Sequence, residues 1–144
     1  MATSGLSQPA FLNHIGIAVS ALPQLAQLFQ ILGLSFKNQE DVPEQGVRTH
    51  FLPLPVVQTQ LEFLEVTDPE GTVAKFIEKR GPGIHHLSFQ VKTGELDPLC
   101  ATLRKAGYRL TYDAPKKGAH QMRVNFIHPA TAGGILIEVM EAQG

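Results

Sequence analysis

The sequence predicts an α+β fold in which paired βαβββ modules form a cleft-shaped mixed sheet. The first observation is strand-like alternation of apolar residues over 11–19, which occurs again over 84–91. The second is that each of these segments precedes apolar residues at helical spacing, which end at Gly33 and Gly107. Since neither half has enough elements to cover its own sheet, the two modules are expected to pack as one domain around a shared cleft.

The remaining elements of the first half follow from periodicity and from turn residues. A helix is predicted over 22–32, with Pro23 in its first turn. Strand-like segments are predicted at 34–38, 47–54 and 59–66. Residues 42–46 read as a turn or an active-site loop, and a connecting helix is predicted over 68–79.

The second half repeats this order after the sharp break at 81–83. Its predicted elements are a strand at 84–91, a helix at 96–106, and strands near 108–112, 122–127 and 134–140. The whole chain, 1–144, is therefore expected to be a single domain. Its predicted parts are a first module at about 11–66, a connecting helix at about 68–80 and a second module at about 83–141.

Composition and charge exclude several classes of function. A chain of 144 residues with 43% hydrophobic and 17% charged residues is typical of one soluble globular domain. A net charge of -1 provides no broad positive field, so neither nucleic acid nor a membrane surface is expected as a partner. No apolar run approaches the length of a membrane span.

The N-terminus and the cysteine content bear on the compartment. The first lysine is Lys37 and the first arginine is Arg48, so the N-terminus lacks the charge of a signal or transit peptide. Residues 1–9 are read as a short, frayed lead. The single cysteine, Cys100, lies on an apolar helical stripe and is expected to be a buried small hydrophobe. A cytoplasmic location is expected.

Two histidines and two carboxylates occupy matching positions in the two halves. His14 and His86 lie in the first strand of each half, and Glu62 and Glu138 lie in the last. The spacings from histidine to glycine and from glycine to carboxylate each differ by only two positions between the halves. A carboxylate within an apolar strand is costly unless it is paired or coordinated. The pattern therefore predicts one divalent metal ion, with Zn, Co, Ni or Mn suited to these ligands.

The other histidines and one lysine pair carry weaker functional signals. His85 is expected to point away from His86 and to have a packing role. Three histidines lack a counterpart in the other half and are expected to be structural or at the surface: His50, His120 and His128. The Lys116–Lys117 pair is either a solvated pair or part of a loop that closes on an anionic ligand.

Several segments resemble the vicinal oxygen chelate superfamily, which has the glyoxalase fold, and within it the methylmalonyl-CoA epimerases. The resemblance covers 12–141. Its most specific parts are Pro43–Val47, the double histidine at 85–86, and Phe126–Pro129 followed by two glycines at 133–134.

This resemblance implies an isomerase that interconverts (2R)- and (2S)-methylmalonyl-CoA by proton transfer α to the thioester, through a metal-stabilised enolate. It implies metal ligands at His14, Glu62, His86 and Glu138, with Glu138 also the catalytic base. It further implies an acyl-CoA substrate and a homodimer.

The chain departs from the epimerase pattern at two positions. Thr49 stands where some epimerases have a glutamate, which leaves the second proton carrier unassigned. Ala130 stands where relatives often have a lysine. Two alternatives remain open, namely a glyoxalase I-like lactoylglutathione lyase and a non-catalytic ligand-binding protein of the same fold. A ring-cleaving dioxygenase is disfavoured, because it would use two histidines and one glutamate with open positions.

Overall fold

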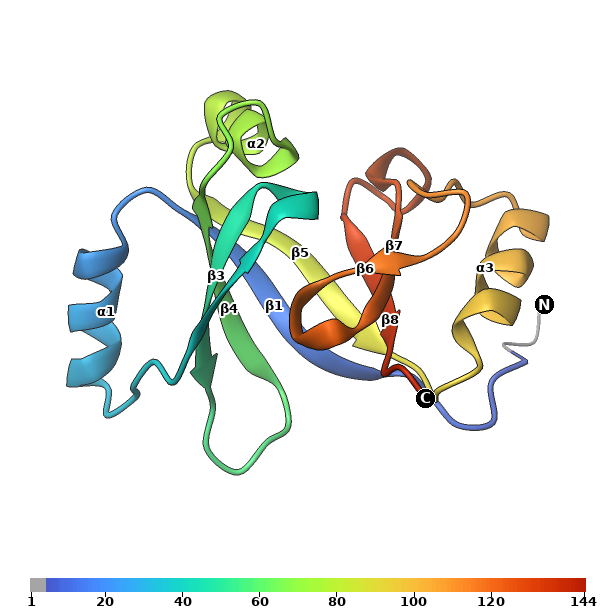
Figure 1. The fold of residues 1–144 in the computed structure, drawn as a ribbon, viewed down its shortest axis with the longest axis horizontal. Helices are drawn as coiled ribbons and strands as arrows, with labels where there is room; N and C mark the ends of the chain where they lie inside the picture. The colour runs from blue at the N-terminus through green and yellow to red at the C-terminus, as the bar shows by residue number, and fades with distance from the viewer. Residues whose placement is uncertain (1–4) are drawn as a thin grey trace. The chain divides into compact units, whose positions relative to one another are not determined.

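The computed structural model describes residues 5–144, which form two compact units. The N-terminal unit contains residues 13–85, and the C-terminal unit contains residues 86–144 together with residues 5–12. Figure 1 shows the course of the chain through both. The single-domain organisation stays a prediction, and the part of the predicted lead at residues 1–4 lies outside the described residues.

The N-terminal unit is a sheet with two helices. Its elements are β1 (Phe11–Val19, which enters from the other unit), α1 (Leu22–Ile31), β2 (Gln39–Val42), β3 (Val47–Pro53), β4 (Gln60–Val66) and α2 (Thr72–Arg80). The strand order is β2-β3-β4-β1, in which β1 and β4 are parallel and the other neighbours antiparallel. A short 3-10 turn at Pro43–Gln45 joins β2 to β3.

The C-terminal unit repeats this arrangement. Its elements are β5 (Gly83–Gln90, which begins in the other unit), α3 (Leu96–Lys105), β6 (Lys116–Lys117), β7 (Arg123–Ile127) and β8 (Ile137–Glu141). Within this unit β6, β7, β8 and β5 follow one another, with β5 and β8 parallel and the other neighbours antiparallel. The α+β class and the repeated βαβββ order are thus confirmed.

Each module has its helix packed on one face of its sheet (Figure 1). In the N-terminal unit, α1 contributes Leu22, Leu25 and Phe29 to a core around Val19, Leu52 and Phe63. The Phe63 ring lies 5.4 Å from the Phe29 ring and 5.3 Å from the Phe36 ring, both edge-on. Such edge-to-face aromatic contacts add to the stabilisation from apolar burial.

In the C-terminal unit, α3 packs through Leu96 and Cys100 against Val91, Ile127 and Val139. Cys100 is 1% exposed, which confirms it as a small core residue. The described part of the N-terminal lead also joins this core. Leu6 and Ala10 pack against it, and the Ser7 backbone N–H donates to Glu95 Oε1 at 3.0 Å, so residues 5–10 are anchored rather than frayed.

The predicted strand at 34–38 was wrong, because the ladder begins only at Gln39. Residues 37 and 38 already contact Phe51 through two backbone hydrogen bonds of 3.0 Å, but regular pairing with β3 starts after them. The Phe36 side chain instead enters the core.

The predicted strand at 108–112 is reduced to one bridge between Leu110 and Ile127. Tyr112 does not continue the ladder, because its N–H and C=O bond to the Asn125 side chain at 3.0 Å each. A side chain thus takes the place of a strand partner. Lys116–Lys117, which was expected to be a solvated pair or part of a loop, is exposed and forms the short edge strand β6.

Gly46 ends the turn after β2 and fixes the start of α2. It has φ +66°, a left-handed conformation that favours glycine, and a Cβ there would lie 3.0 Å from Asp68 Cβ. The Gly46 carbonyl accepts the N–H groups of Thr67 and Asp68 at 2.9 and 3.2 Å. A tight turn follows, so the connecting helix begins at Thr72 rather than near residue 68. None of the helices formed by residues 5–144 is long and apolar enough to cross a membrane.

Candidate metal centre

His14 and Glu62 form a buried pair in the N-terminal unit. In the parallel β1–β4 register Glu62 lies opposite Gly16, two positions beyond His14, so both side chains project from the same face. Their Nδ1 and Oε2 atoms are 3.1 Å apart, and each residue is 4% exposed. Both residues are predicted metal ligands, and the structure shows them in contact with each other.

Two polar neighbours orient this pair. His14 Nδ1 lies 2.7 Å from Asn13 Oδ1, and Gln60 Nε2 donates to Glu62 Oε2 at 3.1 Å. Both contacts of Nδ1 are to side-chain oxygens, so Asn13 and Glu62 orient the imidazole ring of His14. Sequence reasoning did not assign these roles to Asn13 and Gln60. Two features of the sequence could have indicated them: Asn13 is adjacent to His14, and Gln60 lies two positions before Glu62 on the same face of the strand.

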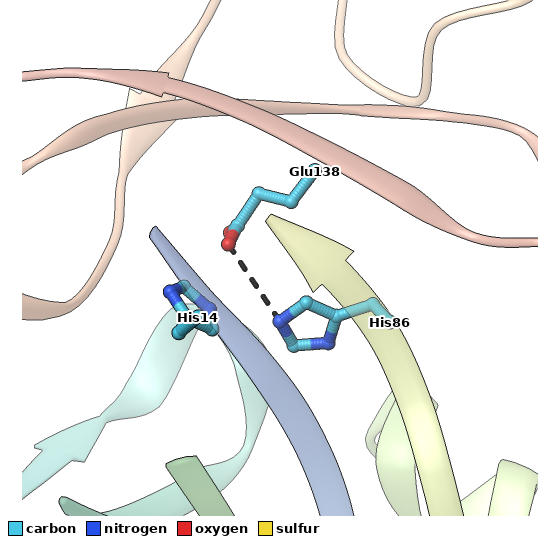
Figure 2. Close-up of side chains that lie close together, drawn as sticks. All are labelled: His14, His86 and Glu138. Atoms are coloured by element: carbon cyan, nitrogen blue, oxygen red, sulfur yellow. Dashed lines mark ion pairs between the residues drawn. The ribbon is translucent and has the colours of Figure 1, made fainter. Parts of the chain in front are cut away.

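His86 and Glu138 form the equivalent pair in the C-terminal unit (Figure 2). Glu138 lies opposite Ser88, two positions beyond His86, so the register repeats that of the first half. His86 Nε2 and Glu138 Oε1 are 3.6 Å apart, and each residue is 3% exposed. The Phe126 ring packs edge-on against the imidazole, with 5.9 Å between the ring centres.

The donor chemistry of the two pairs fits a divalent metal ion. His14, His86 and Glu138 are all buried, and each offers a nitrogen or oxygen ligand atom. Burial of carboxylates is unfavourable without a compensating charge, and imidazole with carboxylate is a ligand set used by zinc and similar ions. The chain thus supplies a His-His-Glu donor set that suits such an ion. One pair belongs to each unit.

Thr49 and His50 lie on opposite faces of β3. Thr49 is 1% exposed and lies two positions from Phe51, the partner of Glu62 in the ladder, so it shares the face that carries Glu62. His50 is turned away from this face. Its Nε2 is 3.1 Å from Glu65 Oε1 in a partly exposed pair, which confirms a structural role.

The other histidines make local contacts. The His85 ring packs edge-on against Phe76 at 4.9 Å, which agrees with the packing role predicted for it. His128 Nδ1 accepts the Ala130 N–H at 3.1 Å at the start of a 3-10 turn. His120 is exposed and has φ +57°.

Glu141 is the second buried carboxylate on the last strand, after Glu138, and sequence reasoning did not single it out. Its Oε1 accepts Arg123 Nη1 at 2.6 Å, and its Oε2 accepts the backbone N–H groups of Gly94 and Leu96 at 2.8 and 2.9 Å. These N–H groups lie at the start of α3, where a carboxylate is favoured by the helix dipole. Glu141 therefore anchors α3 to β8.

Comparisons with known proteins agree with this geometry. The family model described as the glyoxalase/bleomycin resistance protein/dioxygenase superfamily matches residues 13–126. The chain is 37% identical over 133 residues to the ethylmalonyl-CoA/methylmalonyl-CoA epimerase of Cereibacter sphaeroides, covering 89% of this chain and 95% of that protein.

Solved structures extend the likeness to three dimensions. The methylmalonyl-CoA epimerase of Mycobacterium tuberculosis superposes with a TM-score of 0.86 at 38% identity, covering 99% of this chain and 92% of that one. A variant of the Streptomyces coelicolor methylmalonyl-CoA epimerase, in complex with 2-nitronate-propionyl-CoA, gives 0.84 at 31% identity, covering 94% and 96%. The chain therefore belongs to the glyoxalase/bleomycin resistance protein/dioxygenase superfamily and, within it, to the methylmalonyl-CoA epimerase family.

Proposed function

We propose that this protein is a metal-dependent epimerase that interconverts (2R)- and (2S)-methylmalonyl-CoA. One observation carries the proposal. Two buried histidine–glutamate pairs occupy equivalent register positions in the two halves of a chain whose relatives are named as methylmalonyl-CoA epimerases. Removal of a proton α to a thioester requires stabilisation of the developing negative charge, and such a site suits that task.

We propose that the two pairs together hold one divalent ion, Co, Zn, Ni or Mn, with His14, Glu62, His86 and Glu138 as its ligands. When bound, the ion would act as a Lewis acid toward the charge that develops on the thioester oxygen. The protein residues would fix the geometry. The acceptors around His14 Nδ1 hold one imidazole, and Phe126 packs against the other.

Glu138 is the carboxylate proposed to move the proton. Gln60 donates to Glu62 Oε2 and so helps to fix that carboxylate as a ligand. Glu138 is held differently, with its Oε1 atom 3.6 Å from His86 Nε2. Because Glu138 is buried, bulk water would not compete with it for the α-proton of a bound substrate. Thr49, on the Glu62 face, supplies a hydroxyl in place of a second carboxylate.

The proposed partner is a small acyl-CoA, since a relative of the same fold is known in complex with 2-nitronate-propionyl-CoA. A homodimer is expected as well, and light scattering on a sizing column would measure its mass. Both histidine–glutamate pairs belong to one chain, so the proposed site needs no residue from a second copy.

Exchange of the substrate α-proton tests the function. The metal-loaded protein is incubated with methylmalonyl-CoA in D₂O, and deuterium incorporation is followed by mass spectrometry. Wild type should exchange rapidly, and Glu138→Gln should lose roughly a thousandfold or more in rate, as expected for a lost general base whose charge also shapes the site. Glu65→Gln, a partly exposed carboxylate on the other face, is the matched control and should exchange normally.

Three results would overturn the proposal. Turnover of the methylglyoxal–glutathione adduct without exchange of methylmalonyl-CoA would identify a lyase. Ligand binding without turnover of either substrate would identify a binding protein. Normal exchange by Glu138→Gln would remove Glu138 as the base.

The metal requires its own measurement. Elemental analysis of purified protein should find about one divalent ion per chain, and EDTA should lower the melting temperature because a ligand that binds only the folded state stabilises it. His14→Ala and His86→Ala should each lose both the ion and its stabilising effect. Stoichiometric metal retained by either variant would contradict the ligand assignment.

A further inference from the structure

A line of aromatic contacts runs from His86 to an exposed lysine within the C-terminal unit. The His86 ring meets Phe126 at 5.9 Å, Phe126 meets Tyr112 at 6.1 Å, and Lys116 Nζ lies 4.6 Å from the centre of the Tyr112 ring. The last contact is a cation–π interaction, which holds an ammonium group over a ring. A continuous series of contacts therefore links an exposed cation to a proposed metal ligand.

The backbone of Tyr112 is held in place by a buried side chain. Asn125 is fully buried and bonds to both the N–H and the C=O of Tyr112. Arg104 Nη2 donates to the same carbonyl at 2.8 Å and to that of Asp113 at 2.9 Å. Four hydrogen bonds thus fix the loop that carries the ring, even though its residues are largely exposed.

The sheet register decides which lysine faces the proposed centre. Lys116 pairs with Val124, whose side chain shares a face with Phe126, and Phe126 in turn lies opposite Glu138. Lys116 therefore projects from the face that carries Glu138. Lys117 pairs with Arg123 and projects from the opposite face.

We propose that Lys116, held over Tyr112, binds a phosphate group of the coenzyme A moiety and so acts as a specificity residue for acyl-CoA over shorter thioesters. This inference rests on the proposed function. An acyl-CoA carries its reacting carbons at one end and its phosphates at the other, joined by the pantetheine arm. A fixed ammonium group on the same face as Glu138, but at the surface, matches that division of charge. A lysine pre-oriented by a ring loses less conformational entropy on binding.

Comparison of two substrates tests the proposal. Methylmalonyl-CoA carries the phosphates, and methylmalonyl-pantetheine has the same reacting group without them. Lys116→Gln should raise KM for the CoA ester about 5- to 20-fold with kcat nearly unchanged, the size of one partly solvated charge-assisted contact. The same variant should leave the kinetics with the pantetheine ester unchanged. Tyr112→Leu should raise KM for the CoA ester by part of the same factor, because it removes the ring that holds Lys116. Tyr112→Phe keeps the ring and should retain wild-type kinetics.

Lys117→Gln is the matched control, since it removes the same charge from the neighbouring residue on the opposite face, and it should behave as wild type. Equal effects of Lys116→Gln on both esters, or equal effects of the two lysine variants on the CoA ester, would overturn the inference.

Failure of the proposed function is distinguishable, because wild type would then turn over neither ester. Calorimetric titration with free coenzyme A still decides the inference in that case. Lys116→Gln should weaken binding by the same factor and Lys117→Gln should not. Absence of binding by wild type, or identical binding by both variants, would refute the inference.

Discussion

Glu141 and Glu138 are buried carboxylates three positions apart on β8, and the structure predicts opposite consequences when each is neutralised. Glu141→Gln keeps the shape of the side chain. If the amide oxygen continues to accept the two N–H groups at the start of α3, its NH₂ group faces Arg123 Nη1, now 2.6 Å from Glu141 Oε1. The charge-assisted hydrogen bond from Arg123 is then replaced by two donors that face each other. The two hydrogen bonds from Gly94 and Leu96 are weakened, because their acceptor is no longer charged.

The expected cost is about 2–3 kcal/mol of unfolding free energy, because hydrogen bonds to charged groups contribute about 1.5–3 kcal/mol each and Arg123 keeps its second partner, Asp97. For a chain of this size that corresponds to a melting temperature lower by about 6–12 °C. Urea and thermal unfolding of metal-free protein would measure both values. Glu65→Gln breaks only a partly exposed pair with His50 and should cost less than about 1 kcal/mol.

The same measurement on Glu138→Gln separates structure from chemistry. That variant should lose proton exchange while its metal-free form unfolds near the wild-type midpoint. A Glu141→Gln variant that is as stable as Glu65→Gln would refute the claim that Glu141 anchors α3. A Glu141→Gln variant that is stable but inactive would show that this carboxylate belongs to the reaction.

Three further predictions concern the scaffold. Gly46→Ala should lower the unfolding free energy by about 1–3 kcal/mol, because it combines φ +66° with a Cβ contact of 3.0 Å. Gly33→Ala should lower it by less, because Gly33 has φ +81° but no atom near the added Cβ. Urea unfolding midpoints would compare the two variants. The Arg123 guanidinium lowers the pKa of Asp97 below 3.8, so their pairing should stabilise the fold above pH 3.8 and be lost as the pH falls below it. The difference in unfolding free energy between wild type and Asp97→Asn should therefore shrink as the pH falls through that range. A difference that does not change with pH would contradict the pairing. Burial raises the pKa of the Cys100 thiol, so a disulfide reagent at about pH 8 should modify it only in urea, and rapid labelling of native protein would disprove its burial.

Much of the fold was predictable because each half has clear periodicity. Period-two alternation located β1, β3, β4 and β5 to within one or two residues, and the glycines after α1 and α3 marked the helix ends. Thr49 lies on the Glu62 side of β3 and His50 on the other side, as period-two alternation requires. These features depend on local sequence alone.

The errors arose where a distant residue decides the local structure. Residues 108–112 have strand-like composition, but Asn125 binds the backbone of Tyr112 and ends the pairing there. Nothing in the local sequence indicates that partner. The role of Glu141 was missed for a similar reason, since its partners Gly94, Leu96 and Arg123 come from other elements.

The duplication predicted the register of the two histidine–glutamate pairs well, but it did not predict how each pair is supported. His14 contacts Glu62 through Nδ1, whereas His86 contacts Glu138 through Nε2, although the backbone register of the two pairs is the same. The difference comes from side chains outside the repeat, because Asn13 and Gln60 bind the first pair and Phe126 packs on the second. Equivalent backbone positions can thus supply equivalent side chains whose neighbours differ. On the proposal above, Glu62 is a ligand only, and Glu138 also moves the proton. On this proposal the reaction depends on residues that the repeat does not duplicate, which is why Thr49 and Lys116 are the informative positions for substitution.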